Sequence, residues 1–250
     1  MKLLLFLVSI QVILPTQPLV IFLINLLVIL ASQQLFCGAI STPSNINNDK
    51  RSSFSSNQDT NSQAGSTSLE NTGHSEMMGL AVFKDDALVG ELSAGETMCH
   101  LIIQNDLESC VLTIPNPEDE KAYIDLFLYN RSKPKIKVKL VNGSPLITID
   151  LKLTAKILSS DENAQYVQEE QLSAISTSSN EYLKNMICDY LYRTTLELGS
   201  DIDGFGRYAL SLFNTTQEFK DYNWLDNYCN SFFDVNVDID VQSALLLSGK

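Results

Sequence analysis

The chain has 250 residues, 44% of them hydrophobic and 8% aromatic, which is enough apolar material for one large domain or two small ones. Its 17 basic and 30 acidic side chains give a net charge of -13 at pH 7. This acidic excess excludes nucleic-acid binding, which needs clustered Lys and Arg against phosphate, and excludes membrane attachment by charge alone.

The N-terminal segment is apolar and predicts export or membrane anchoring. Lys2 precedes two aliphatic runs, 3–14 and 19–31, which a stretch with two prolines separates. Neither run alone reaches the roughly 20 residues that cross a bilayer, but together they do, with a kink at the prolines. Residues 1–37 are therefore interpreted as a secretory signal or an uncleaved anchor. A buried core helix is the alternative, and the absence of a polar face argues against it.

A polar tract follows the apolar segment. Residues 38–76 are rich in Ser, Asn, Thr and Gln. Such a composition cannot bury enough apolar surface to offset the entropy of ordering the chain, so the tract is predicted to be a disordered linker. The folded domain is expected to occupy residues 77–250.

This domain opens with a predicted hairpin and a capped helix. Two β-prone runs, 79–84 and 87–90, flank an acidic turn. Ser93 then precedes a helical stretch that ends at Asn105, and Glu96 stands three residues after Ser93. That spacing is typical of a capping box, in which each side chain bonds the other's backbone N–H.

Residues 110–114 are predicted to form a short strand, and apolar and polar residues alternate in three later runs, 122–129, 135–140 and 147–157. Which face of the first of these three runs is packed stays ambiguous, and the Asn142-Gly143 pair predicts a turn between the other two. Alternation gives each strand one packed and one wet face, which favours an antiparallel sheet. A helical stripe from Leu172 to Thr194, with 176–180 as a candidate interruption, supplies the cover for the packed face. The predicted fold class is α+β, an antiparallel sheet with helices packed on one face.

Two shorter helices, 206–213 and 216–228, and a closing strand over 234–241 complete the predicted elements. The closing strand carries an acidic ladder, and an earlier strand carries a basic one. Their residues are Lys135, Lys137 and Lys139, and Asp234, Asn236, Asp238 and Asp240. Opposite charges across neighbouring strands contribute about 0.2–1 kcal/mol each. We predict that the ladders share one sheet face, on strands that are adjacent or one strand apart.

Two motifs after the long helix resemble a dinucleotide-binding site and a calcium-binding loop, but neither has the sequence context that such a site requires. Residues 204–209 match G-x-G-x-x-A, but a helix precedes them, whereas dinucleotide binding needs a strand there. Residues 201–204 start like a calcium loop, but Leu212 stands where Glu is required. The glycines are interpreted as turn residues, and Ser200 or Asp201 is expected to accept backbone N–H bonds and cap the next helix.

The positions of the histidines and cysteines give no indication of a catalytic residue, a metal site or a cofactor. His74 falls in the linker, and His100 is interpreted as a structural imidazole within the first helix. The cysteines after the linker have no CxxC spacing, so a zinc site is not expected. They are interpreted as buried free thiols, with one disulfide as the alternative.

From Gly79, the run GLAVFKDDALVGELSAGET resembles the opening of the C-terminal domain of spore germination proteins of the Ger(x)C family. Three later blocks agree in order: the strand pair over 135–156, the run SDIDGFG at 200–206 after a long helix, and Trp224 before a closing strand. The resemblance covers residues 77–248. Typical members carry Trp-Asp after a lipoprotein cysteine and two further domains, so this chain looks like a shortened member.

The resemblance implies a function. Ger(x)C proteins are C subunits of nutrient germinant receptors, lipid-anchored in the spore inner membrane beside A and B subunits, and they are not known as enzymes. Acylation, with palmitate, is expected at Cys37, although Phe36 before it is bulkier than lipoprotein peptidase prefers. Candidate interface residues are Gly204, Phe205, Gly206 and Trp224, with a structural turn and a core anchor as the alternative.

The predicted function is therefore that of a membrane-tethered, non-catalytic receptor subunit that acts by scaffolding. A secreted or anchored binding domain with the same fold and a different partner is the alternative. An exported hydrolase is a third class of function, and a polar pocket around His100 in the structure would support it.

Overall fold

The computed structural model describes residues 32–40, 75–84, 87–119, 121–160 and 169–242. Its strands form a three-stranded sheet in the order β1-β2-β3 and a four-stranded sheet in the order β4-β5-β6-β7. The strands are β1 (Ser32–Ile40), β2 (Ser75–Lys84), β3 (Ala87–Leu92), β4 (Cys110–Pro115), β5 (Tyr123–Val141), β6 (Ser144–Ser160) and β7 (Phe232–Gln242). The α+β class with helices on one face of a sheet is confirmed.

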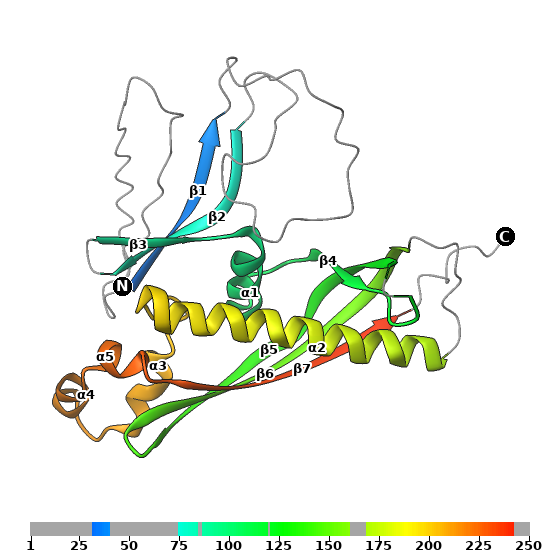
Figure 1. Cartoon of the computed structure of the whole chain (residues 1–250). Coiled ribbons are helices and arrows are strands. Elements are labelled where there is room, and N and C mark those ends of the chain that lie inside the picture. The colour runs from blue at the N-terminus through cyan, green and yellow to red at the C-terminus, as the bar shows by residue number, and fades with distance from the viewer. Residues whose placement is uncertain (1–31, 41–74, 85–86, 120, 161–168, 243–250) are drawn as a thin grey trace, which may run out of the picture.

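Five α-helices and two shorter helical turns accompany the sheets in this part of the chain. They are α1 (Ala94–Gln104), α2 (Glu169–Arg193), the π-helix η2 (Thr194–Leu198), α3 (Gly206–Ala209), the 3-10 turn η3 (Leu210–Leu212), α4 (Thr216–Tyr222) and α5 (Trp224–Tyr228). The long helix α2 lies along the larger sheet, and α3, α4 and α5 lie together at one end of that sheet (Figure 1). None of the described helices is long and apolar enough to cross a bilayer.

The smaller sheet contains the predicted hairpin and one strand that was not predicted. β2 and β3 pair antiparallel, with Lys84 opposite Ala87. β1 pairs antiparallel with the other edge of β2, and its register shifts between Phe36 and Gly38, so Cys37 lies at a bulge. Strand pairing thus includes residues assigned above to the anchor and the linker. Residues 1–31 and 41–74 lie outside the described part, and the domain boundaries stay a prediction.

Helix α1 begins at the predicted capping box. The Ser93 N–H donates to Glu96 Oε2 at 2.7 Å, and the Glu96 N–H donates to Ser93 Oγ at 3.4 Å. The helix ends at Asn105, whose φ of 61° is left-handed, as is common after the last turn. Its inner face buries Cys99 and Ile102 in the core.

The larger sheet is antiparallel except at its last strand. The predicted strands 122–129 and 135–140 are one strand, β5, with register shifts around Pro134. The turn from β5 to β6 runs through Asn142 (φ 51°) and Gly143 (φ 86°), as the Asn-Gly signal predicts. β7 pairs parallel with β6. The alternation of apolar and polar residues along β7 shows which side chains face the core, but not whether the strand runs parallel or antiparallel to β6. The parallel pairing therefore differs from the antiparallel sheet that was predicted.

Helix α2 is continuous through residues 176–180, and this polar stretch binds the edge of the sheet. Ser176 Oγ donates to the carbonyl of Ile239 at 2.6 Å, and the Ile239 N–H donates to Asn180 Oδ1 at 2.8 Å. The outward backbone groups of an edge strand otherwise invite pairing with another chain. The polar residues that resemble a helix interruption therefore protect β7.

The ladder prediction is confirmed. β6 lies between the two ladder strands, and paired residues in either kind of ladder point to the same face. Lys135 stands opposite Asp150, which stands opposite Asn236. The charged ladders therefore share the face of the sheet that points away from α2, one strand apart.

Candidate functional site

The SDIDGFG segment forms a loop around a buried carboxylate. Asp201 is 2% exposed and accepts hydrogen bonds from the N–H groups of Phe205 and Gly206, each at 2.8 Å. The indole Nε1–H of Trp224 donates to the same carboxylate at 2.7 Å. The predicted local role of this region, a side chain that caps the next helix, is confirmed for Asp201.

Burial dominates the electrostatics of Asp201. Removal from water disfavours the charged form and raises the pKa of this carboxyl from 3.8 to about 6, and nearby Asp203 adds to the rise. The backbone and indole hydrogen bonds act in the opposite direction, because they stabilise the anion. The loop thus encloses a carboxylate that is costly to ionise.

The second carboxylate of the loop, Asp203, connects three segments that are distant in sequence. Its Oδ1 lies 2.8 Å from His100 Nδ1 of α1, and its Oδ2 accepts from the Tyr190 hydroxyl of α2 at 2.8 Å. Gln104 Nε2 donates to the Asp203 carbonyl at 2.6 Å. The predicted structural role of His100 agrees with this arrangement, in which the imidazole holds a loop.

The His100–Asp203 pair has the chemistry of a catalytic base and its orienting acid, but not the access. The His100 side chain is 1% exposed and that of Asp203 is 0% exposed, so a substrate does not reach them. The neighbouring Cys99 thiol is also buried, and burial raises its pKa, so the thiolate needed for nucleophilic attack is disfavoured. This geometry gives no support to the hydrolase alternative.

The four candidate interface residues lie in or next to the interior. Phe205 is 0% exposed and Trp224 3% exposed, and both rings pack on Tyr228. Gly204 has a left-handed φ of 69°, and an added Cβ there would lie 2.6 Å from Arg207 Nη2. These positions favour the alternative reading of a structural turn and a core anchor, and the interface role stays a prediction.

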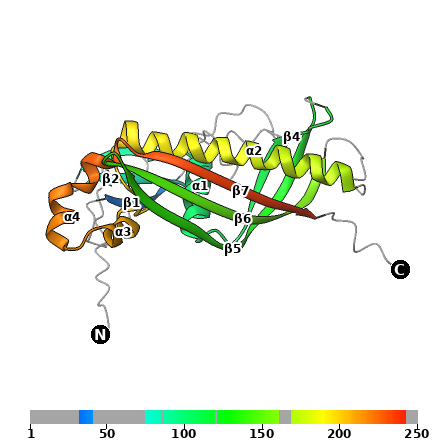
Figure 2. The same ribbon diagram turned by 90° about the horizontal axis from the view of Figure 1, so that it is seen from below.

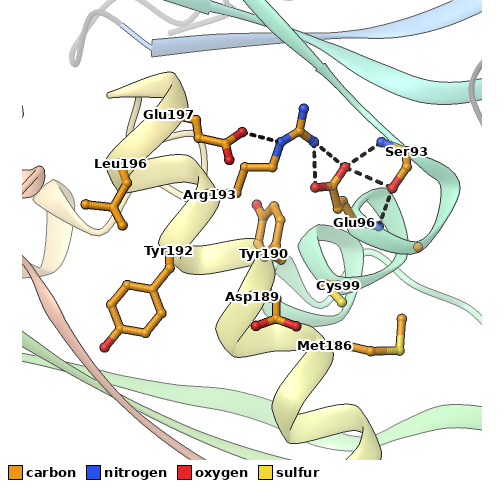
Figure 3. Close-up of a pocket in the computed structure, with 11 residues that line it drawn as sticks. Ser93, Glu96, Cys99, Met186, Asp189, Tyr190, Tyr192, Arg193, Leu196 and Glu197 are labelled. Atoms are coloured by element: carbon orange, nitrogen blue, oxygen red, sulfur yellow. Dashed lines mark hydrogen bonds and ion pairs between the residues drawn. The ribbon is translucent and has the colours of Figure 1, made fainter. Parts of the chain in front are cut away.

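A pocket of about 390 Å³ opens between the start of α1 and the end of α2 (Figure 3). Arg193 crosses it: Nη1 lies 2.5 Å from Glu96 Oε2, and Nε lies 3.0 Å from Glu197 Oε2. Arg193 Nη2 also donates to the Glu91 carbonyl of β3 at 3.1 Å. Tyr190 lines the pocket and bonds Asp203 beneath it, so the pocket and the buried network share one wall.

Sequence reasoning missed the pocket, although parts of it left signals. Arg193 and Glu197 have the i,i+4 spacing of a helical ion pair, and Glu96 belongs to the capping box. Nothing local indicates that Arg193 and Glu96 meet, because 97 positions separate them.

The described cysteines and acidic groups form no metal site. Cys99, Cys110, Cys188 and Cys229 are free thiols. Within the described residues, no three His, Cys, Asp or Glu side chains gather closely enough to hold a metal ion.

Comparison with known protein families shows to which family the chain belongs. The family described as spore germination B3/GerAC like, C-terminal, matches residues 78–244. The chain belongs to this family. The GerAC-like match includes the capping box of α1, the SDIDGFG loop and Trp224, and the resemblance predicted from the sequence is confirmed. Cys37 lies before the matched residues.

Among solved structures, the GerAC-like chain is similar to the crystal structure of the GerBC protein. The TM-score is 0.59 and the identity 19%, over 68% of this chain and 52% of the GerBC chain. At that identity the likeness shows a shared fold. The chain spans about half the length of GerBC. No curated protein matches the chain.

Proposed function

We propose that the chain is the C component of a nutrient germinant receptor, a membrane-tethered and non-catalytic subunit that acts in spore germination. The family match over residues 78–244 carries this proposal. The fold shared with the GerBC protein supports it.

A scaffolding role suits the buried network. Asp201 and Asp203 bind the SDIDGFG loop to α1, α2 and α5 through groups that are almost entirely enclosed. Enclosed networks of this kind, when fully satisfied, make the surrounding elements rigid and fix one arrangement of them. Such rigidity suits a domain that offers its partners one fixed surface.

The proposed partners are the receptor A and B subunits, at the spore inner membrane. The tether is the apolar segment 1–31 or a lipid on Cys37. A tether raises the local concentration of the domain at the membrane, so weak contacts with partners suffice for assembly.

Deletion of the gene in the spore-forming host tests the role in germination. We expect nutrient-triggered germination to slow or stop, while germination with a non-nutrient trigger proceeds at the normal rate. Normal nutrient responses in the deletion strain would refute the receptor role. Complementation with the wild-type gene shows that the loss belongs to this chain.

Mass spectrometry of the mature N-terminus tests the tether. An acylated Cys37 at the new N-terminus is the expected product, and Cys37→Ser should then release the protein from the membrane fraction. An intact N-terminus identifies an uncleaved anchor, and Cys37→Ser then leaves the protein in the membrane.

A secreted or anchored binding domain with another partner is the second candidate function. The observation in its favour is that the likeness to GerBC, at 19% identity, shows a shared fold alone. A lipid-free protein cleaved after the apolar segment and recovered from the medium would support this candidate over the receptor subunit.

A further inference from the structure

The face of the larger sheet that points away from α2 carries two charged columns. Lys135, Lys137 and Lys139 project from β5, and Asp234, Asp238 and Asp240 project from β7. All six side chains are exposed. β6 separates the columns, and α2 lies along the other side of the sheet (Figure 2).

The register sets one lysine of β5 level with one aspartate of β7, whereas Lys135 is level with Asn236 and Lys139 with Phe232. Lys137 pairs with Thr148 of β6, which pairs with Asp234. Adjacent strands are about 4.8 Å apart, so the two columns run roughly 10 Å from each other. The face therefore has a basic side and an acidic side.

One residue already joins the two sides within the chain. Arg131 Nη2 lies 2.5 Å from Asp238 Oδ2, and Nη1 lies 3.9 Å from Asp240 Oδ2. The three lysines of the basic column and Asp234 make no ion pair with any residue that the structure describes. Their charges are available to a partner.

We propose that this face binds a second copy of the chain, with β5 of each copy over β7 of the other. A rotation of 180° about an axis parallel to the strands exchanges the two columns, so every contact of a basic with an acidic side chain occurs twice. A rotation axis across the strands would instead place lysine over lysine. Charge complementarity thus selects one arrangement.

The middle of the face adds an apolar contact and two like-charge contacts under this symmetry. Leu146 of β6 and Phe232 of β7 pair at the level of Lys139, and Phe232 is 60% exposed, which gives the stacked sheets an apolar contact at one end. The axis places Asp150 and Lys152 of β6 near their own copies, with Asp150 opposite Lys135 and Lys152 opposite Asp238. Exposed ion pairs are individually weak and are screened by salt, so the association is weak and depends on ionic strength.

The test uses two reversed versions of the full-length chain. The first carries Lys135→Glu, Lys137→Glu and Lys139→Glu, and its face is acidic on both sides. The second carries Asp234→Lys and Asn236→Lys, which leaves the bridge from Arg131 in place. Chains with two different epitope tags are co-expressed, solubilised in a non-ionic detergent and recovered through one tag.

For the wild type we expect recovery of the second tag, falling as salt is raised. Each reversed chain should lose about tenfold or more of its self-association, and a mixture of the two reversed chains should regain it, since their faces are complementary. The matched control reverses three exposed lysines elsewhere, Lys121→Glu, Lys184→Glu and Lys220→Glu, with the same change in net charge, and should associate like the wild type.

Restored association in the mixture excludes misfolding as the cause of the losses. The proposal is overturned if the wild type shows no salt-sensitive self-association, if the reversed chains associate like the wild type, or if the mixture fails to recover. A thiol cross-linker checks the arrangement: Lys137→Cys in one copy should join Asp234→Cys in the other, and a pair of Lys137→Cys copies should give only the background of the wild-type cysteines. None of this depends on the germination role.

Discussion

Replacement of Asp201 by Asn tests the central feature of the SDIDGFG loop. The carboxylate accepts three hydrogen bonds in a site that is 2% exposed. Asn has one carbonyl oxygen for these donors, and its NH₂ group faces an N–H. An unsatisfied buried donor costs about 1–3 kcal/mol, so the variant is expected to be less stable at neutral pH by an amount in that range.

The pH dependence of stability separates the charge of Asp201 from its hydrogen bonds. In the folded state its pKa is about 6, above the ordinary value of 3.8. Between these values the native protein binds more protons than the unfolded chain, so stability is greatest at low pH and is lost as the pH rises. Linkage puts the loss at roughly 3 kcal/mol in total, with about 1–2 kcal/mol of it between pH 5 and pH 7.5.

Urea unfolding of the full-length chain in a mild detergent, followed by the fluorescence of Trp224, measures this loss. Trp224 is the single tryptophan and its indole donates to Asp201, so the signal reports the loop. The free energy of unfolding of the wild type should fall by about 1–2 kcal/mol more than that of Asp201→Asn over the same pH interval. Equal pH dependence in the two proteins would refute the reasoning, whatever their stabilities at one pH.

Three further substitutions test the turn, the sheet edge and the helix cap. Gly204→Ala places an alanine at a left-handed φ of 69° and should cost about 1–3 kcal/mol of unfolding free energy in urea. Gly143→Ala, also at a positive φ, should cost a similar amount, because the group nearest the new Cβ at position 204 is the exposed end of the flexible Arg207 side chain, which moves aside; unchanged stability of both variants would contradict the turn interpretation. Asn180→Ala removes an edge contact of β7 and should lower the urea midpoint and increase light scattering on storage, whereas Thr177→Ala, exposed on the same helix, should do neither. Ser93→Ala removes a cap from α1 and should cost about 1 kcal/mol in the same unfolding assay; an unchanged midpoint would contradict the role of the capping box.

Elements whose signals are local were predictable from the sequence. Ser93 and Glu96 bond each other within one helical turn, and Asn142-Gly143 forms its turn because both residues tolerate positive φ. Alternation identified the packed faces of β6, β7 and the second half of β5, and the ladder prediction followed from it, whereas the faces of 122–129 stayed ambiguous. In each case the residues that determine the structure lie within a few positions of one another.

The candidate site depends on contacts that local signals do not encode. His100 and Asp203 are 103 positions apart, and neither residue's neighbours indicate that they meet. The direction of β7 depends on the path of the chain between β6 and β7, which alternation does not report. The polar run 176–180 was misread as a candidate break, because its partner, the backbone of Ile239, lies about sixty positions away.

The parallel pairing of β6 with β7 has a consequence for how the protein is made. An antiparallel neighbour can follow its strand after a short turn, whereas this one arrives only after α2 and the small helices have been synthesised. Until then one edge of β6 stays unpaired while the polypeptide is still emerging from the ribosome. Nascent chains that stall before Phe232 should therefore depend on chaperones and be sensitive to proteases, and the final strand acts as the closing step of folding.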